Sequence, residues 1–165
     1  MAKQKTIEDL FYDTLKDIYY AERKILKTLP KMARAAQSAE LKAAFEKHKA
    51  QTEGQIERLQ QVFEIIGKRA VGKTCDAIEG IVSEGEEIIE EYGGTPAVDA
   101  GLISAAQAVE HYEITRYGTL KRWAQVLGHK AAVPLLDQTL QEEGQTDKDL
   151  TALADSGANA MAKAG

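Results

Sequence analysis

The segment AQAVEHYEITRYGTL, residues 106–120, decides how the rest of the sequence is interpreted. Its composition favours a helix, and residues spaced by four and three share one helical face. That face consists of Ala106, Glu110, Glu113, Tyr117 and Leu120. Apolar residues at this spacing form the buried stripe of an amphipathic helix. Two carboxylates therefore point where leucine is expected, and buried carboxylates need a partner.

The rest of the chain shows the same helical pattern. Three prolines and abundant Ala, Glu, Lys, Gln and Leu predict an all-α protein. Capping residues and glycines predict helices over about 6–37, 38–67, 76–92, 96–127 and 131–155, followed by a frayed tail over 156–165. We expect Thr6, Ser38 and Thr95 to cap the helices that follow them. Pro96 then occupies a first helical position and Gly128 ends the fourth helix.

Short turns near residues 37 and 129 predict two antiparallel helical hairpins. The two hairpins carry a faint repeat, because YYAERKILKTL resembles AVEHYEITRYGTL, and QTEGQIERL resembles EEGQTDKDL. The long connection between them traverses the bundle and contains the short helix. The sequence thus predicts a four-helix bundle with an extra helix in the crossover. The first turn, at Gln37 and Ser38, is expected to tolerate short polar insertions.

Composition limits the classes of function. A chain of 165 residues with 44% hydrophobic content fits one domain over residues 1–165. The formal net charge of −5 argues against binding to nucleic acid, which needs clustered Lys and Arg. The one cysteine, Cys75, cannot form an internal disulfide. The sequence shows no apolar signal core and no apolar run of bilayer length, so we expect no membrane association and a cytoplasmic protein.

Each long helix has a polar gap halfway along its apolar stripe. In the first hairpin Glu22 lies level with Thr52 and near His48; in the second, Glu113 and Glu143 lie at comparable heights. Carboxylates gathered in a dry layer repel one another unless protons or cations neutralise them. Bundle cores use this mixture of carboxylate and imidazole to hold two metal ions. The candidate ligands are Glu22, His48, Glu110, Glu113, Glu143 and Asp147.

Five segments carry a resemblance to a known family. They are TIEDLFYDTLKDIYYAE (6–22), FEKHKAQTEGQIERL (45–59), CDAIEGIVSEGEEIIE (75–90), AAQAVEHYEITRYGTL (105–120) and TLQEEGQTDKDLTALA (139–154). Together they resemble the YciF/YciE group of ferritin-like stress proteins. The resemblance implies a ferritin-like or rubrerythrin-like bundle with an extra crossover helix, a tendency to dimerise, a two-metal site and a link to general stress responses. It implies no settled activity.

The candidate site departs from the usual two-metal pattern. The resemblance leads us to expect an acid where the chain has Gln51, and the fifth helix offers Glu143 and Asp147 without a histidine. An amide is a poor substitute for a carboxylate, so one metal position is expected to be weaker. His111 and Glu142 point away from the inward stripe and are expected to be solvated. Several tyrosines, Tyr117 among them, fit either packing or hydrogen bonds to the carboxylates.

Two classes of function follow. The first is a metal-binding stress protein with two ions, iron first and manganese or zinc as alternatives, and redox chemistry with oxygen or peroxide. The second is a metal-free or singly occupied helical dimer without catalysis. Iron storage in a cage is a weaker third, since nothing indicates a shell-forming interface. A homodimer is expected because Phe11, Tyr12, Tyr19 and Ile88 exceed what a four-helix core needs.

Overall fold

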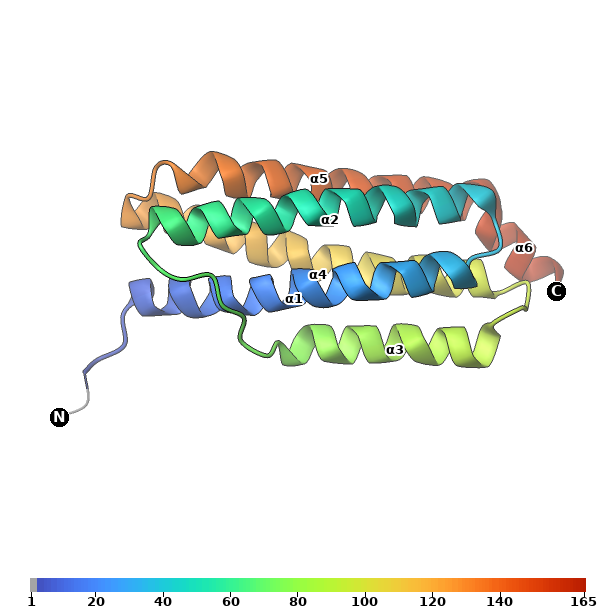
Figure 1. Ribbon diagram of the computed structural model, residues 1–165. Helices are drawn as coiled ribbons and strands as arrows, with labels where there is room; N and C mark the ends of the chain where they lie inside the picture. Colours follow the sequence, from blue (N-terminus) through green and yellow to red (C-terminus); the bar gives the residue numbers. More distant parts are fainter. Residues whose placement is uncertain (1–2) are drawn as a thin grey trace.

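The structure is a computed structural model that describes residues 3–165, and every regular element in that range is helical (Figure 1). The main helices are α1 (Ile7–Ala35), α2 (Ala39–Ile65), α3 (Asp76–Tyr92), α4 (Val98–Leu127) and α5 (Ala132–Leu153). A π-helical turn, η1 (Ala154–Ala158), and a short helix, α6 (Asn159–Ala164), follow. The predicted all-α bundle is confirmed.

The four long helices form two antiparallel hairpins, α1–α2 and α4–α5 (Figure 1). Helix α1 also packs against α4, and α2 packs against α5, so each long helix has two antiparallel neighbours. Helix α3 lies outside this square and packs on α1 and α4. The predicted apolar stripes form the core, as Leu15, Ile18, Leu59 and Leu120 show with at most 1% of their surface exposed.

Two predicted caps start the first hairpin. The Thr6 hydroxyl accepts a hydrogen bond from the Asp9 amide, and the Asp9 carboxylate accepts one from the Thr6 amide, which completes a capping box. The Ser38 hydroxyl accepts from the Leu41 amide and caps α2. The α1–α2 turn is also tied to α4, because the buried Asp99 carboxylate accepts from the amides of Gln37 and Ser38 at 2.7 and 2.9 Å.

The crossover between the hairpins runs over the outside of α1 before it enters α3 (Figure 1). Its Lys73 amide donates a 3.0 Å hydrogen bond to the carbonyl of Lys16 in the middle of α1. Gly67 lets the chain leave α2, since its φ of +68° is a left-handed conformation that suits glycine. The Cys75 thiol accepts from the Ile78 amide and caps α3.

The predicted start of the fourth helix at Pro96, with Thr95 as its cap, is wrong. Helix α4 begins at Val98, and its N-cap position, Ala97, makes no side-chain hydrogen bond. The Thr95 hydroxyl instead donates to the carbonyl of Tyr92 at 2.7 Å and accepts from the Ala97 amide. Thr95 therefore closes the end of α3 through a turn, and this delays α4 by two residues.

The predicted frayed tail over 156–165 is also wrong. After Leu153 the chain continues through η1 and α6, which pack against α4. Ala154 and Ala158 are partly buried against the core. These small side chains let the backbone approach α4 closely, so little apolar bulk is needed for docking.

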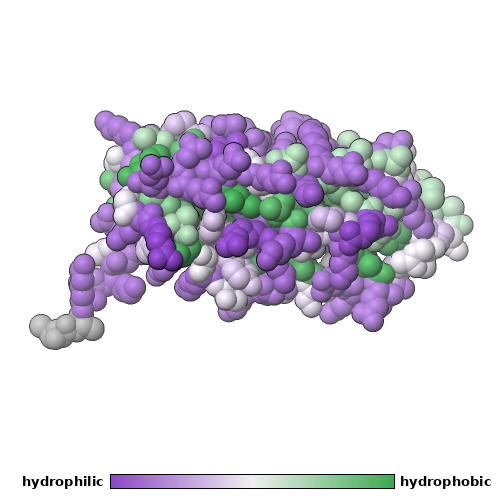
Figure 2. Space-filling model, in the orientation of Figure 1, coloured by the Kyte–Doolittle hydropathy of each residue, from purple (hydrophilic) through white to green (hydrophobic). Residues whose placement is uncertain are grey.

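The surface is largely hydrophilic. Figure 2 shows one face covered mainly by hydrophilic side chains, with hydrophobic ones visible in the seams between them. Within the described residues, no helix combines the length and apolar character needed to cross a membrane. Fewer apolar side chains are available for a dimer interface than the sequence predicted, because Phe11 and Tyr19 are buried in the core. Leu10 and Tyr92 remain about half exposed, so the homodimer stays a prediction.

Candidate metal centre

Helix α4 supplies two carboxylates to the middle of the bundle. Glu110 and Glu113 are fully buried, together with Ala106, Tyr117 and Leu120 from the same helical face. Their spacing of three residues places both carboxylates on one side of the helix. The inward face predicted from the 106–120 segment is confirmed.

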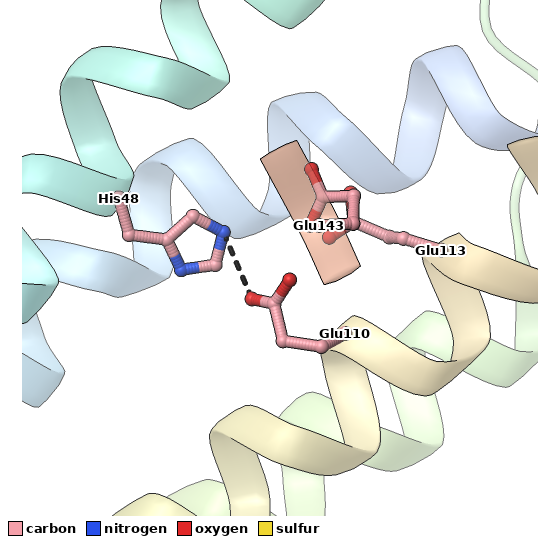
Figure 3. Close-up of side chains that lie close together, drawn as sticks. All are labelled: His48, Glu110, Glu113 and Glu143. Atoms are coloured by element: carbon pink, nitrogen blue, oxygen red, sulfur yellow. Dashed lines mark ion pairs between the residues drawn. The ribbon is translucent and has the colours of Figure 1, made fainter. Parts of the chain in front are cut away.

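One residue from each of two other helices meets this pair. His48 projects from α2 with 3% of its surface exposed, and Glu143 projects from α5 with none exposed. Figure 3 shows all four side chains pointing toward one another. One ligand atom of each residue can be chosen so that the four atoms lie within 4.8 Å of one another. We call His48, Glu110, Glu113 and Glu143 the core cluster.

The polar atoms of the core cluster lack hydrogen-bond partners among the described residues. Both oxygens of each of its three carboxylates, and Nε2 of His48, are buried and unpartnered. His48 Nε2 and Glu110 Oε1 lie 3.1 Å apart but are not aligned for a hydrogen bond (Figure 3). Unpartnered buried carboxylates are costly. Their arrangement is that of ligand atoms turned toward a shared centre.

Burial controls the protonation of the core cluster. Burial, reinforced by Glu143, raises the pKa of Glu110 and of Glu113 well above the ordinary value. Burial also lowers the pKa of His48, although Glu143 opposes this shift. The histidine is therefore neutral at pH 7, which is the form that binds metal. Without a cation Glu110 and Glu113 favour their protonated forms; a bound cation would favour their ionised forms.

A fourth carboxylate, Glu22 of α1, lies beside the core cluster. It is fully buried, and its Oε1 accepts a 2.5 Å hydrogen bond from the Tyr117 hydroxyl. Burial and the neighbouring Glu143 raise the pKa of Glu22 to about 8. Glu113 lies within hydrogen-bonding reach of Glu22, a bond that forms only if one of the two carboxyls is protonated. Of the two roles that the sequence left open for the tyrosines, Tyr117 has the hydrogen bond to a carboxylate.

Asp147, the sixth predicted ligand, lies outside the core cluster. Its carboxylate is 3.1 Å from Nε2 of the exposed His111, and Gln107 donates to it at 3.2 Å. Asp147 lies one turn beyond Glu143, about 6 Å further along the helix axis. Its side chain is also shorter than that of glutamate and does not bring it into the four-residue group.

Sequence reasoning missed a polar network between α2 and α5. Arg58 donates to the Thr139 hydroxyl at 3.0 Å and pairs with Glu142, and the buried Gln55 donates to Glu142 at 3.1 Å. Glu142, expected to be solvated, is therefore an ion-pair partner. Gln51 accepts from the Thr146 hydroxyl at 3.3 Å. Thr139, one turn before Glu143, was the available signal, because a small hydroxyl there continues the inward face of α5.

The core cluster fits a divalent metal ion. Three carboxylates and one neutral imidazole are donors that suit iron, manganese or zinc. One ligand atom from each of the four residues can face a shared ion, and coordination would give these buried atoms the partners that they lack. Glu22 retains one unpartnered oxygen beside them and extends the same carboxylate layer.

Comparison with known proteins identifies relatives of nearly full length. Residues 6–163 match the family described as "Domain of unknown function (DUF892)". Protein YciF of Escherichia coli strain K12 is 45% identical over 160 residues, which cover 96% of each protein. The crystal structure of the E. coli stress protein YciF superposes with a TM-score of 0.90, at 45% identity and with 94% of this chain and 99% of that one covered.

Two further solved structures have the same fold. YcfI of Rhodopseudomonas palustris, described as a proposed structural protein, is 43% identical with a TM-score of 0.88 and covers 92% of this chain and 97% of its own. A protein from Xanthomonas campestris pv. campestris has a TM-score of 0.75 at 20% identity, with 95% of this chain and 96% of that one covered. At that identity the likeness concerns the fold alone.

Proposed function

We propose, since the chain belongs to the DUF892 family and is a homologue of the stress protein YciF, that it is a metal-binding protein of the stress response. The core cluster holds the metal. The observation that carries this proposal is the convergence of His48, Glu110, Glu113 and Glu143 with buried, unpartnered ligand atoms within 4.8 Å.

A second ion completes the proposed centre. Glu22 stands on the α1 side, close to Glu113 and Glu143, and this proximity supports a role for Glu113 and Glu143 as ligands shared by two ions. The Tyr117 hydroxyl orients Glu22. Arg58 counteracts the raised pKa of Glu22 and so favours its ionised, ligating form. Iron is the first choice, and when bound it would supply redox chemistry with oxygen or peroxide.

One observation favours a second candidate function. The carboxyls are within hydrogen-bonding reach in the pairs Glu22–Glu113 and Glu110–Glu143. Burial raises the pKa of Glu22, Glu110 and Glu113 and so favours their protonated forms. Shared protons could neutralise the layer instead of cations. The protein would then be a helical scaffold that acts through contacts with partners, in line with the description of the R. palustris relative.

Metal content separates the two functions. Protein produced in iron-replete medium and purified without chelator is analysed by inductively coupled plasma mass spectrometry. The metal-binding function predicts metal bound in stoichiometric amounts, with two ions per chain if Glu22 completes the second position. The scaffold function predicts a negligible amount and no uptake when Fe(II), Mn(II) or Zn(II) is added.

A pair of variants tests the ligands directly. Glu113→Gln together with Glu143→Gln preserves shape and removes two buried charges. This variant should lose the metal, and its melting temperature should no longer respond to EDTA, because bound metal stabilises the folded state. Glu87→Gln with Glu90→Gln is the matched control, since both residues are exposed on α3. If the melting temperature of the wild-type protein changes neither with added metal nor with EDTA, the metal-binding proposal is wrong.

A further inference from the structure

A cavity under α3 leads from the surface to the core cluster. It lies between α1, α3 and α4, and His48 forms part of its wall. The cavity has a volume of about 20 Å³, above the roughly 10–15 Å³ that one water molecule needs. Its wall includes the partly exposed Ile81 and Ile89 as well as the buried Val82 and Val109, so it spans from surface to interior.

The wall of this cavity is apolar apart from three side chains. Two of these have partners elsewhere: the Thr28 hydroxyl donates to the carbonyl of Lys24 at 2.9 Å, and Glu86 pairs with Lys31 at 3.1 Å. The third is His48. A molecule inside the cavity therefore finds few hydrogen-bonding groups until it reaches the imidazole.

Helix α3 forms the roof of the cavity and approaches α4 closely. A Cβ atom added at the buried Gly85 would lie 3.6 Å from Cβ of Ala105, an ordinary contact distance. A larger side chain at position 85 would extend into the cavity, because Gly85 and Ala105 both line it. At Gly80, on the exposed side of α3, an added Cβ would meet nothing within 4 Å.

We propose that this cavity admits dioxygen to the His48 side of the core cluster. The proposal deepens the metal-binding function and rests on it for its chemical purpose. Dioxygen is small and uncharged and loses almost no hydrogen bonds on leaving water, so an apolar wall accepts it. Hydrogen peroxide would lose its hydrogen bonds to water along the same wall, and that loss is costly. The cavity therefore selects dioxygen over peroxide as the oxidant.

The test uses metal-free protein, so its readout does not depend on metal binding. Dioxygen is dissolved under pressure, and its paramagnetic enhancement of methyl relaxation is measured by NMR. Methyl groups of Val82 and Val109, which line the cavity, should relax markedly faster with dioxygen than those of Leu59 and Val62, which are also buried but lie outside it. Equal enhancement at all four residues would overturn the proposal.

Two matched variants complete the test. Gly85→Leu should fill the cavity and reduce the enhancement at Val109 several-fold, whereas Gly80→Leu, the same change on the exposed face, should leave it unaltered. Val82→Ala widens the cavity and should increase the enhancement at Val109. This variant tests the proposal independently if Gly85→Leu fails to fold. An unchanged enhancement in folded Gly85→Leu, or in Val82→Ala, refutes the route. Metal analysis of the same samples reports separately on the proposed function.

Discussion

Tyr117 of α4 and Glu22 of α1 are joined across the centre of the bundle by a 2.5 Å hydrogen bond, although they are 95 residues apart in the sequence. Both side chains are almost completely buried. Burial, together with the Glu22 carboxylate, raises the pKa of the Tyr117 phenol well above its ordinary value, so Tyr117 stays a hydrogen-bond donor. This bond connects the two hairpins at the level of the core cluster.

Replacing this tyrosine should weaken the fold. Tyr117→Phe keeps the ring and leaves the Glu22 oxygen without its donor, so the free energy of unfolding should fall by about 1–3 kcal/mol. Urea denaturation of wild type and variant, both treated with chelator, measures the difference. Tyr92→Phe is the control, because Tyr92 is about half exposed. Equal losses in the two variants would show that the bond to Glu22 contributes nothing.

Without metal, the protein should become more stable as pH is lowered. Glu22 has a pKa of about 8 in the folded state and an ordinary value of 4.5. Between these values the folded protein holds a proton that the unfolded chain has released, so lowering the pH favours the folded state. The stability is complete below about 4.5 and is lost as pH rises through about 8.

Urea denaturation of chelator-treated protein between about pH 9 and about pH 6 measures this effect, which amounts to about 1.4 kcal/mol per pH unit for each proton. Glu110 and Glu113, whose pKa values are also raised, add to the slope. Glu22→Gln should reduce the slope. A free energy of unfolding that is flat or rises with pH would contradict the raised pKa values.

The α1–α2 turn should depend on α4. Asp99→Ala leaves the amides of Gln37 and Ser38 without their acceptor, which should lower the free energy of unfolding by about 2–4 kcal/mol. Asp99→Asn keeps one acceptor oxygen and should cost less. Thermal denaturation followed by circular dichroism ranks the three proteins. If both variants have the same melting temperature as the wild type, the contact between Asp99 and the α1–α2 turn does not stabilise the fold.

The same contact changes the expectation for insertions. From the sequence, the turn at Gln37 and Ser38 was expected to accept short polar insertions. Because Asp99 binds both amides, a glycine inserted between them separates the pair from one carboxylate. We now expect this insertion to lower the melting temperature about as much as Asp99→Ala, measured in the same experiment.

The homodimer remains a prediction, and exposed apolar residues would form its interface. Leu10, Tyr92 and Val126 are between 47% and 64% exposed, and their burial in an interface would be favourable. Multi-angle light scattering should then give twice the 18.1 kDa of one chain at tens of micromolar protein. A mass of one chain under these conditions contradicts the dimer.

Local sequence signals predicted most of the fold because they act over one helical turn. Thr6 and Ser38 cap helices through hydrogen bonds three residues away, and Gly128 ends α4 in a left-handed conformation. Thr95 was misassigned because its hydroxyl can serve the helix before it or the one after it. The choice depends on the turn that connects α3 to α4.

The candidate site was predictable as far as helical period allows. Periodicity placed Glu110, Glu113 and Glu143 inward, and hairpin length placed Glu113 and Glu143 at comparable heights. Periodicity could not exclude Asp147, because Asp147 lies four positions after Glu143 and shares its helical face. Whether Asp147 reaches the core cluster depends on its distance along the helix axis and on the length of its side chain. Nor could periodicity predict the pairing of Arg58 with Glu142, which depends on the rotation of α2 against α5.

The buried charge is divided unequally between the two hairpins. Three carboxylates of the core cluster belong to α4 and α5, whereas α1 and α2 contribute one carboxylate and one imidazole. In metal-free protein at high pH, the repulsion between buried carboxylates therefore acts mainly within the α4–α5 hairpin. Amide hydrogen exchange should then be fastest, among the central turns of the long helices, in α4 and α5. Local opening of this hairpin would expose the carboxylates to water while the α1–α2 hairpin stays folded, which provides a way for cations to enter the core.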